Sequence, residues 1–153
     1  MATVPIIISG DDDLREKFDR LQGSILGQKM MSEIGAFAVA MIDSRTSEGK
    51  DFRGKPFKGY SPKYKLFRAK FGRPVNKVDF NFFGTMMTAL TYKSESKEVQ
   101  IYFLPTPDER NPKITSPEKA FFLNQKRKFF GLNATDVRKI KAIIEQYIEK
   151  AFD

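Results

Sequence analysis

Residues 91–104, TYKSESKEVQIYFL, hold the clearest strand pattern in this chain. Thr91–Ser94 and Glu98–Leu104 both read as strands, and the polar Glu95-Ser-Lys between them is suited to a turn. The core of the second arm, Val99-Gln-Ile-Tyr-Phe, alternates well enough to be half buried. We therefore expect a β-hairpin here, with helical patterns on both sides of it.

Upstream of the hairpin, the sequence predicts one long helix from about Asp12 to Arg45. Apolar residues recur at spacings of three to five between positions 14 and 41. Three glycines lie inside this pattern, and each costs a helix about 1 kcal/mol relative to alanine. A break near Gly23–Gly27, or close packing there against another backbone, therefore stays open.

Between the long helix and the hairpin, the pattern predicts a short helix and then a strand. Ser61 and Pro62 are typical of a helix start, because serine caps the helix and proline fits its first position. The helix should run from Pro62 to Phe71. Apolar alternation over Val78–Phe82 then predicts a strand that enters a single helical turn in Gly84–Leu90.

Downstream of the hairpin, two more helices are predicted. Ser116-Pro-Glu begins a short helix that continues to about Gln125, and Arg127–Leu132 should be extended. The last helix begins after Asn133, a capping residue, with Asp136 in its first turn. Its expected apolar stripe is Val137, Ile140, Ile144, Tyr147, Ile148 and Ala151.

The chain is expected to form a single domain over residues 1–153, with two candidate arms. Val4–Ser9, within residues 1–10, is a short β-rich run that suits an edge strand or an N-terminal arm. Pro105–Pro117 is rich in proline and suits a loop or an extended arm. An extended arm could pair with the free sheet edge of a neighbouring molecule.

Residues 52–78 are strongly basic and contain no Asp or Glu. Their cations could hold DNA phosphates without reading bases, could face acidic patches on neighbouring subunits, or could form a solvated positive face. The nine cations are Arg53, Lys55, Lys58, Lys63, Lys65, Arg68, Lys70, Arg73 and Lys77.

Aromatic residues are interleaved with these cations. They could stack on the bases of single-stranded nucleic acid, but core or intersubunit packing is the favoured interpretation because large apolar side chains are usually buried. The six residues are Phe52, Phe57, Tyr60, Tyr64, Phe67 and Phe71.

Composition narrows the function classes. The chain has 27 Lys and Arg against 19 Asp and Glu, a net charge of +8, which favours nucleic acid, anionic membrane or acidic protein partners. It has no His and no Cys, so it lacks imidazole bases, thiolate nucleophiles and the usual zinc ligands. We therefore expect no enzyme activity, no cofactor and no metal, and we interpret Asp11-Asp-Asp as helix capping rather than as a cation site.

The sequence also suggests a soluble protein made inside the cell. Its N-terminus lacks a basic region followed by a long apolar run, so no signal peptide is expected. Charges interrupt the most apolar windows, so no membrane span and no membrane partner are expected either.

Three blocks, in this order and spacing, resemble the tail-completion or virion-morphogenesis proteins of tailed bacteriophages. The blocks are Gly54–Tyr64 (GKPFKGYSPKY), Val78–Leu90 (VDFNFFGTMMTAL) and Arg127–Asp136 (RKFFGLNATD), and the resemblance covers about residue 14 to the C-terminus. The middle block has Phe82-Phe-Gly where the family often has Thr-Gly. The residues that carry the pattern are Pro56, Phe57, Tyr60, Ser61, Tyr64, Asp79, Gly84, Met86, Arg127, Phe129, Gly131 and Leu132.

The resemblance implies an α+β fold, in which a small antiparallel sheet is packed by a long N-terminal helix and a C-terminal helix. It also implies a structural neck protein that joins head or portal to tail as a homo-oligomeric ring, expected to be a hexamer, around the DNA channel. The expected partners are portal or adaptor proteins, tail proteins and packaged double-stranded DNA. The expected location is the virion neck, after assembly in the host cytoplasm.

A second hypothesis is a non-enzymatic nucleic-acid-binding accessory protein that uses residues 52–78. If the cations face a DNA channel, changing Lys63, Lys65, Arg68 and Lys70 to glutamine is expected to leave folding intact while impairing DNA retention or ejection.

Overall fold

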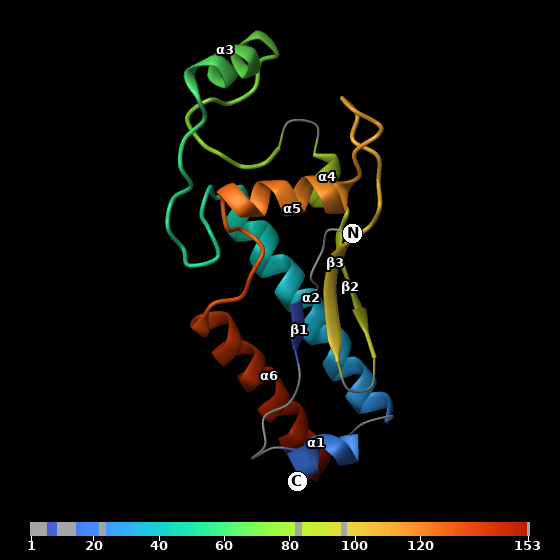
Figure 1. The fold of residues 1–153 in the computed structure, drawn as a ribbon. Coiled ribbons are helices and arrows are strands. Elements are labelled where there is room, and N and C mark those ends of the chain that lie inside the picture. Colours follow the sequence, from blue (N-terminus) through green and yellow to red (C-terminus); the bar gives the residue numbers. More distant parts are fainter. Residues whose placement is uncertain (1–5, 9–14, 22–23, 82–83, 96–97, 153) are drawn as a thin grey trace. The chain divides into compact units, whose positions relative to one another are not determined.

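The computed structural model describes residues 6–8, 15–21, 24–81, 84–95 and 98–152 (Figure 1). The chain divides into two compact units. Unit 1 comprises Met1–Thr3, Ile42–Leu90 and Phe103–Gly131, and unit 2 comprises Val4–Met41, Thr91–Tyr102 and Leu132–Asp153.

Unit 2 is built around the predicted hairpin. Strands β2 (Leu90–Ser94) and β3 (Val99–Phe103) form it, and β1 (Ile6–Ile8) pairs antiparallel with β3, so the sheet order is β1-β3-β2. The expected edge strand near the N-terminus thus belongs to the sheet of its own chain. Helices α1 (Arg15–Leu21), α2 (Ile25–Ser47) and α6 (Ala134–Phe152) accompany the sheet, and the α+β prediction is confirmed.

The single long N-terminal helix that we predicted is wrong, because the helix breaks between α1 and α2. The Ser24 hydroxyl donates to the Leu21 carbonyl (2.6 Å) and accepts from the Gly27 N–H (3.0 Å), so Ser24 caps the start of α2. Helix α2 begins at Ile25, within the Gly23–Gly27 stretch where a break had been left open.

Close packing also occurs, at Gly35 of α2. A Cβ at this position would lie 2.2 Å from the ring of Tyr92 on β2, and the Tyr92 and Ser32 hydroxyls are hydrogen-bonded at 2.8 Å. Glycine therefore allows the helix and the sheet to approach each other. Next to it on α2, Met31, Ile34 and Ala38 are buried.

Helix α6 begins as predicted. The Asn133 side chain accepts from the Asp136 N–H (2.9 Å), and the Asp136 carboxylate accepts from the Asn133 N–H (3.0 Å). The predicted stripe is only partly correct: Val137 is 54% exposed and Ala151 is exposed. The stripe residues that are buried are Ile140, Ile144 and Ile148.

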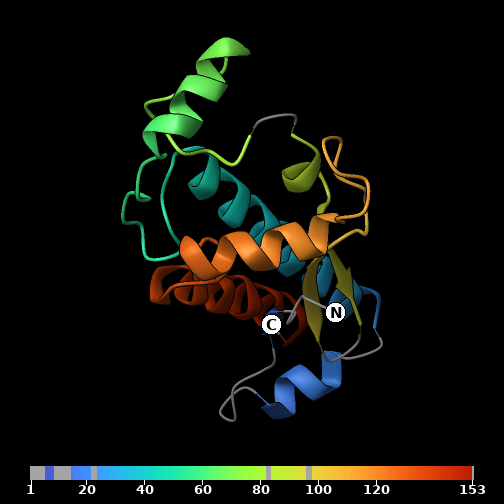
Figure 2. The same cartoon turned by 45° about the horizontal axis from the view of Figure 1, so that its top comes forward.

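Unit 1 contains α3 (Pro62–Lys70), α4 (Thr85–Thr88), α5 (Ser116–Lys126) and the last turns of α2. Helix α3 starts as predicted, with the Ser61 hydroxyl accepting from the Tyr64 N–H (3.3 Å). In both views α3 lies at one end of unit 1, with a long connection before it and another after it (Figures 1 and 2).

The strand predicted over Val78–Phe82 is wrong for the residues that the structure describes, 78–81. The Asp79 carboxylate accepts from the Asn81 N–H (3.0 Å), and Phe80 adopts a positive φ of 57°. This local turn competes with strand geometry. The predicted helical turn is present as α4, which follows Gly84 at φ 86°.

The Pro-rich segment folds back on itself within unit 1. Pro107 and Thr115 form an antiparallel bridge, and the Asp108 N–H donates to the Ile114 carbonyl (2.8 Å). Lys119 of α5 forms an ion pair with Asp108. Burial opposes ionisation of Asp108, but Lys119 and nearby backbone N–H groups outweigh it and lower the pKa of this carboxyl below its ordinary value.

The expectation that no segment resembles a membrane span is wrong, because α2 is long and apolar enough to cross a membrane by length and composition. The core helix of a folded domain passes the same test, and α2 has buried residues along its length, such as Met30 at 1% and Ile42 at 0% exposure. This burial is typical of the core helix of a folded domain.

Candidate functional site

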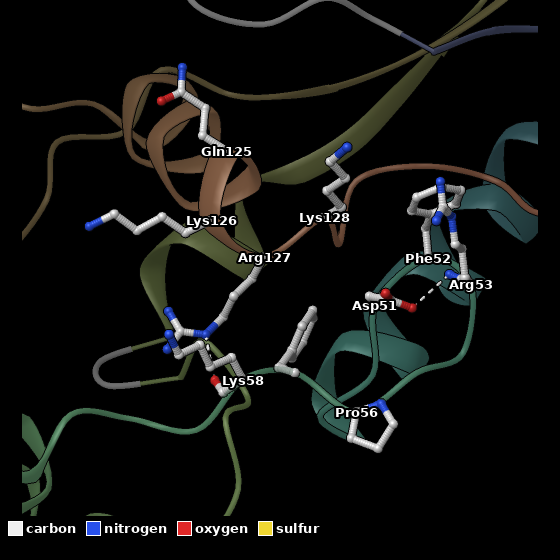
Figure 3. Close-up of a pocket in the computed structure, with 10 residues that line it drawn as sticks. Asp51, Phe52, Arg53, Pro56, Lys58, Gln125, Lys126, Arg127 and Lys128 are labelled. Carbon is white, nitrogen blue, oxygen red and sulfur yellow. Dashed lines mark hydrogen bonds between the residues drawn. The ribbon is translucent and has the colours of Figure 1, made fainter.

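The first block of the resemblance and the start of the third block, Arg127–Gly131, lie side by side in unit 1. The Arg127 guanidinium donates to the carbonyls of Lys58 (2.9 Å) and Gly59 (3.1 Å), and the Phe52 N–H donates to the Lys128 carbonyl (2.9 Å). Figure 3 shows the Arg127 side chain reaching from the end of α5 to Lys58. These hydrogen bonds hold the loop of residues 52–59 against the segment that follows α5.

Aromatic rings add the middle block to this arrangement. Phe57 stacks on Phe80 with ring centroids 4.9 Å apart, and Phe80 meets Phe129 edge to face at 4.8 Å. Phe129 is 0% exposed and also contacts Phe103 at 6.2 Å. One aromatic cluster therefore joins residues from all three blocks.

Close approach of a neighbouring ring favours glycine at position 131. A Cβ there would lie 3.1 Å from Cγ of Phe52, which is tighter than ordinary van der Waals contact. The Gly131 carbonyl also accepts from the Arg45 guanidinium at 2.6 Å. This glycine thus fixes the third block against the end of α2 and against the start of the basic segment.

Arg68 is buried, at 1% exposure, although it was predicted to face DNA or a partner. Its guanidinium donates to the carbonyls of Pro74 (2.7 Å) and Asn81 (3.2 Å) and lies 3.6 Å from the Asp79 carboxylate. A surface role does not fit this burial. Arg68 instead holds α3 to the connection that follows it, so we expect Arg68→Gln to destabilise the fold rather than to leave it intact.

Tyr60 lies between two arginines. The guanidinium of Arg68 is 4.7 Å from its ring centroid and that of Arg127 is 5.7 Å away, distances typical of cation–π contacts. Burial raises the pKa of the Tyr60 phenol, and the positive charge of Arg68 opposes this. The Tyr60 hydroxyl is buried, and no hydrogen bond of good geometry reaches it from the residues that the structure describes.

The aromatic residues in α3 and directly next to it form a row in which each ring contacts the next. Tyr60 and Tyr64 are 5.0 Å apart, Tyr64 and Phe67 5.9 Å, and Phe67 and Phe71 5.0 Å between ring centroids. Arg110, from the Pro-rich loop, lies 4.6 Å above the ring of Phe67. These contacts favour the packing interpretation over base stacking.

The other basic residues of the predicted set lie at the surface of unit 1. They are Arg53, Lys55, Lys58, Lys63, Lys65, Lys70, Arg73 and Lys77, and all eight are exposed. The structure thus leaves a strongly basic surface on which a polyanion could bind, and it removes one predicted member.

Two cations outside the predicted set, Lys126 and Lys128, also belong to this surface. Lys126 and Lys128 line an open hollow of about 250 Å³ together with Arg53 and Lys58 (Figure 3). Asp51 also lines it, where its carboxylate accepts from the N–H groups of Arg53 and Lys55, both at 2.9 Å. The run Lys126-Arg-Lys was the available signal, but only the fold places it beside residue 58.

The remaining motif residues have local structural environments. Pro56 lines the same hollow, Gly84 takes the positive φ before α4, and Met86 is 3% exposed. Ser61 caps α3, as described above, and Leu132 lies in unit 2 and is half-buried.

Charge is divided unevenly between the units. Unit 1 has 17 Lys and Arg and 7 Asp and Glu, a net charge of +10, whereas unit 2 has 10 and 12, a net charge of −2. No group of metal-ligating side chains occurs among the residues the structure describes, and Asp11–Asp13 lie outside them. The chemistry that this surface offers is the binding of anions.

Comparison with known proteins gave no match: no family model fits this sequence, and no curated protein or solved structure is significantly similar to it.

Proposed function

We propose that this chain is a structural protein of a tailed phage, which joins the head or portal to the tail as a neck or tail-completion ring. The observation that supports this proposal best is that the three blocks of the resemblance contact one another in unit 1. Arg127 bonds to the carbonyls of Lys58 and Gly59, and Phe80 contacts both Phe57 and Phe129. Such mutual contacts give a physical reason for three short patterns to occur together.

The basic surface of unit 1 fits this role in two ways. Exposed lysines and arginines around a channel would attract the phosphates of passing DNA without sequence preference. The same cations would also complement acidic patches on neighbouring proteins, and they would steer assembly. Both uses depend on shape and charge rather than on catalysis.

The proposal is tested by locating the chain and measuring its assembly. Electron microscopy of particles that carry a tagged chain should place it at the junction between head and tail. Native mass spectrometry of the chain, alone and mixed with portal and tail proteins, should show a ring, for which we expect six copies. A chain that is absent from particles and stays monomeric with every such partner would contradict the proposal.

The second candidate, a nucleic-acid-binding accessory protein, is favoured by the eight exposed cations alone. The triple variant Lys63→Gln/Lys65→Gln/Lys70→Gln tests it, because these exposed α3 residues can be changed with each costing less than about 0.5 kcal/mol of stability. If α3 contacts phosphates, the slope of log K for duplex DNA against log salt should fall by up to about 3, roughly 0.9 for each contact.

The matched control is Lys29→Gln/Lys113→Gln/Lys139→Gln, which removes the same charge from exposed positions outside residues 52–78. Its salt slope should stay close to that of the unchanged chain. Equal slopes for the two triple variants would mean that DNA binding depends on the net charge of the chain and not on the lysines of α3. Tight DNA binding by a chain that never joins particles would favour the accessory role.

A further inference from the structure

A groove on unit 1 lies between the start of α3 and the end of α5. Its lining combines apolar side chains, Pro62, Tyr64 and Leu123, with the cations of Lys58 and Lys126. The groove also meets Arg127, whose guanidinium is held by carbonyls of the basic segment. It lies beside the hollow of Figure 3 and shares Lys58, Lys126 and Arg127 with it.

The helices on both sides of the groove expose large apolar side chains. On α3, Leu66 is 75% exposed, and Phe71 just after this helix is 54% exposed. On α5, Phe121 is 40% and Phe122 is 59% exposed. Several such residues on two adjoining elements are typical of a surface that binds another protein.

The rings of this region are poorly suited to stacking on nucleobases. Tyr60 already contacts the guanidinium groups of Arg68 and Arg127, and Tyr64 already contacts both Tyr60 and Phe67. Single-stranded nucleic acid needs accessible ring faces for stacking. Base stacking would therefore have to replace contacts that the fold itself uses.

Duplex DNA also leaves part of the groove unused. Its phosphates would interact with Lys58 and Lys126, but non-specific backbone binding gives Leu123 and Pro62 no apolar partner. A polypeptide can supply carboxylates and apolar side chains together. The described lining of the groove contains no Asp or Glu, and unit 1 has a net charge of +10, so a basic or neutral segment would lack charge complementarity.

We infer that this groove binds an acidic polypeptide segment of another protein, through carboxylates at Lys58 and Lys126 and through a large apolar side chain against Pro62, Tyr64 and Leu123. This inference rests on the proposed joining function, and it specifies that one of the proteins joined by this chain presents an acidic segment. Peptide binding is measured on the isolated chain, so its failure would leave the particle experiment unaffected.

Fluorescence anisotropy with three labelled peptides, each about twelve residues long, tests this inference. The first probe repeats Glu-Phe-Glu-Leu, the second repeats Glu-Ser-Glu-Gly, and the third repeats Lys-Phe-Lys-Leu. The first should bind at least about tenfold more tightly than either of the others, because only it offers both carboxylates and apolar side chains. Changing the peptide rather than Leu123 avoids any effect on folding.

The protein variant Lys58→Gln/Lys126→Gln should weaken binding of the first peptide by about tenfold, since it removes two of the cations that line the groove. The control variant Lys113→Gln/Lys139→Gln has the same net charge and should remain within about twofold of the unchanged chain. Circular dichroism would verify that both variants are folded.

Several outcomes would overturn the inference. Equal binding of the first and second peptides would show that surface charge acts without the apolar lining. Equal losses in the two lysine variants would exclude this groove as the site, and absence of binding by the first peptide would exclude the partner class. A labelled oligo(dT) that binds more tightly than the first peptide, and is weakened more by the groove variant than by the control, would assign the groove to nucleic acid.

Discussion

Replacing Arg68 with alanine is expected to lower the free energy of unfolding by about 3 kcal/mol, because removing one partner of a buried charge network leaves the others uncompensated. The Pro74 and Asn81 carbonyls would lose their hydrogen-bond donor, and the Asp79 carboxylate would lose its ion-pair partner. The cation–π contact with Tyr60 would also disappear. Urea denaturation of the purified chain measures the loss.

A second substitution separates charge from geometry at the same position. Arg68→Lys keeps the positive charge but lacks the planar fork that reaches two carbonyls at once, so about half of the loss should remain. Lys65→Ala, on the exposed side of the same helix, is the control and should change stability by less than about 0.5 kcal/mol. If Arg68→Ala proved as mild as Lys65→Ala, the structural role given to Arg68 would be wrong.

Replacing Phe129 with alanine is expected to cost about 3–5 kcal/mol, the usual range when a buried phenylalanine is truncated. Phe129 is 0% exposed, and its ring contacts Phe80 and Phe103, so a cavity would open between two blocks of the resemblance. The loss of stability should be measurable by chemical denaturation. It should also appear as faster hydrogen exchange at the Phe52 N–H, which donates to the Lys128 carbonyl next to Phe129.

The matched control for this substitution is Phe122→Ala. Phe122 belongs to the neighbouring helix α5 but is 59% exposed, so its truncation should cost less than about 1 kcal/mol. Exchange at Phe52 should remain unchanged in this control. Similar losses for the two phenylalanines would contradict the view that Phe129 forms the centre of the cluster.

Local patterns predicted most of the regular elements because each rests on interactions close in sequence. The hairpin, α3, α5 and α6 appear within a few residues of their expected positions, and the caps Ser61 and Asn133 act as expected. The errors also have local causes. Ser24 caps a helix that was expected to continue, and Asp79 bonds to the backbone of Asn81 where a strand was expected.

The candidate site was predicted only in part. The exposed lysines of residues 52–78 follow from composition, because a run of cations without acidic residues is difficult to bury. The burial of Arg68 could not be predicted from that run, because its acceptors include Pro74 and Asn81 backbone carbonyls that only the fold brings near. For the same reason, the addition of Lys126 and Lys128 to the surface depends on contacts between distant segments.

The sequence by itself predicted a hairpin flanked by helices, in agreement with the α+β class that the resemblance implied, and it predicted a basic surface through residues 52–78. Both depend on short-range periodicity and on the number of charges, which a linear chain already contains. Only the tertiary structure decided that Arg68 belongs to the interior and that Arg127 closes on the loop at Lys58. The Arg127 hydrogen bonds join segments far apart in the sequence, and the Arg68 hydrogen bonds depend on how the connection after α3 folds back toward this side chain. In both cases packing sets the spatial proximity.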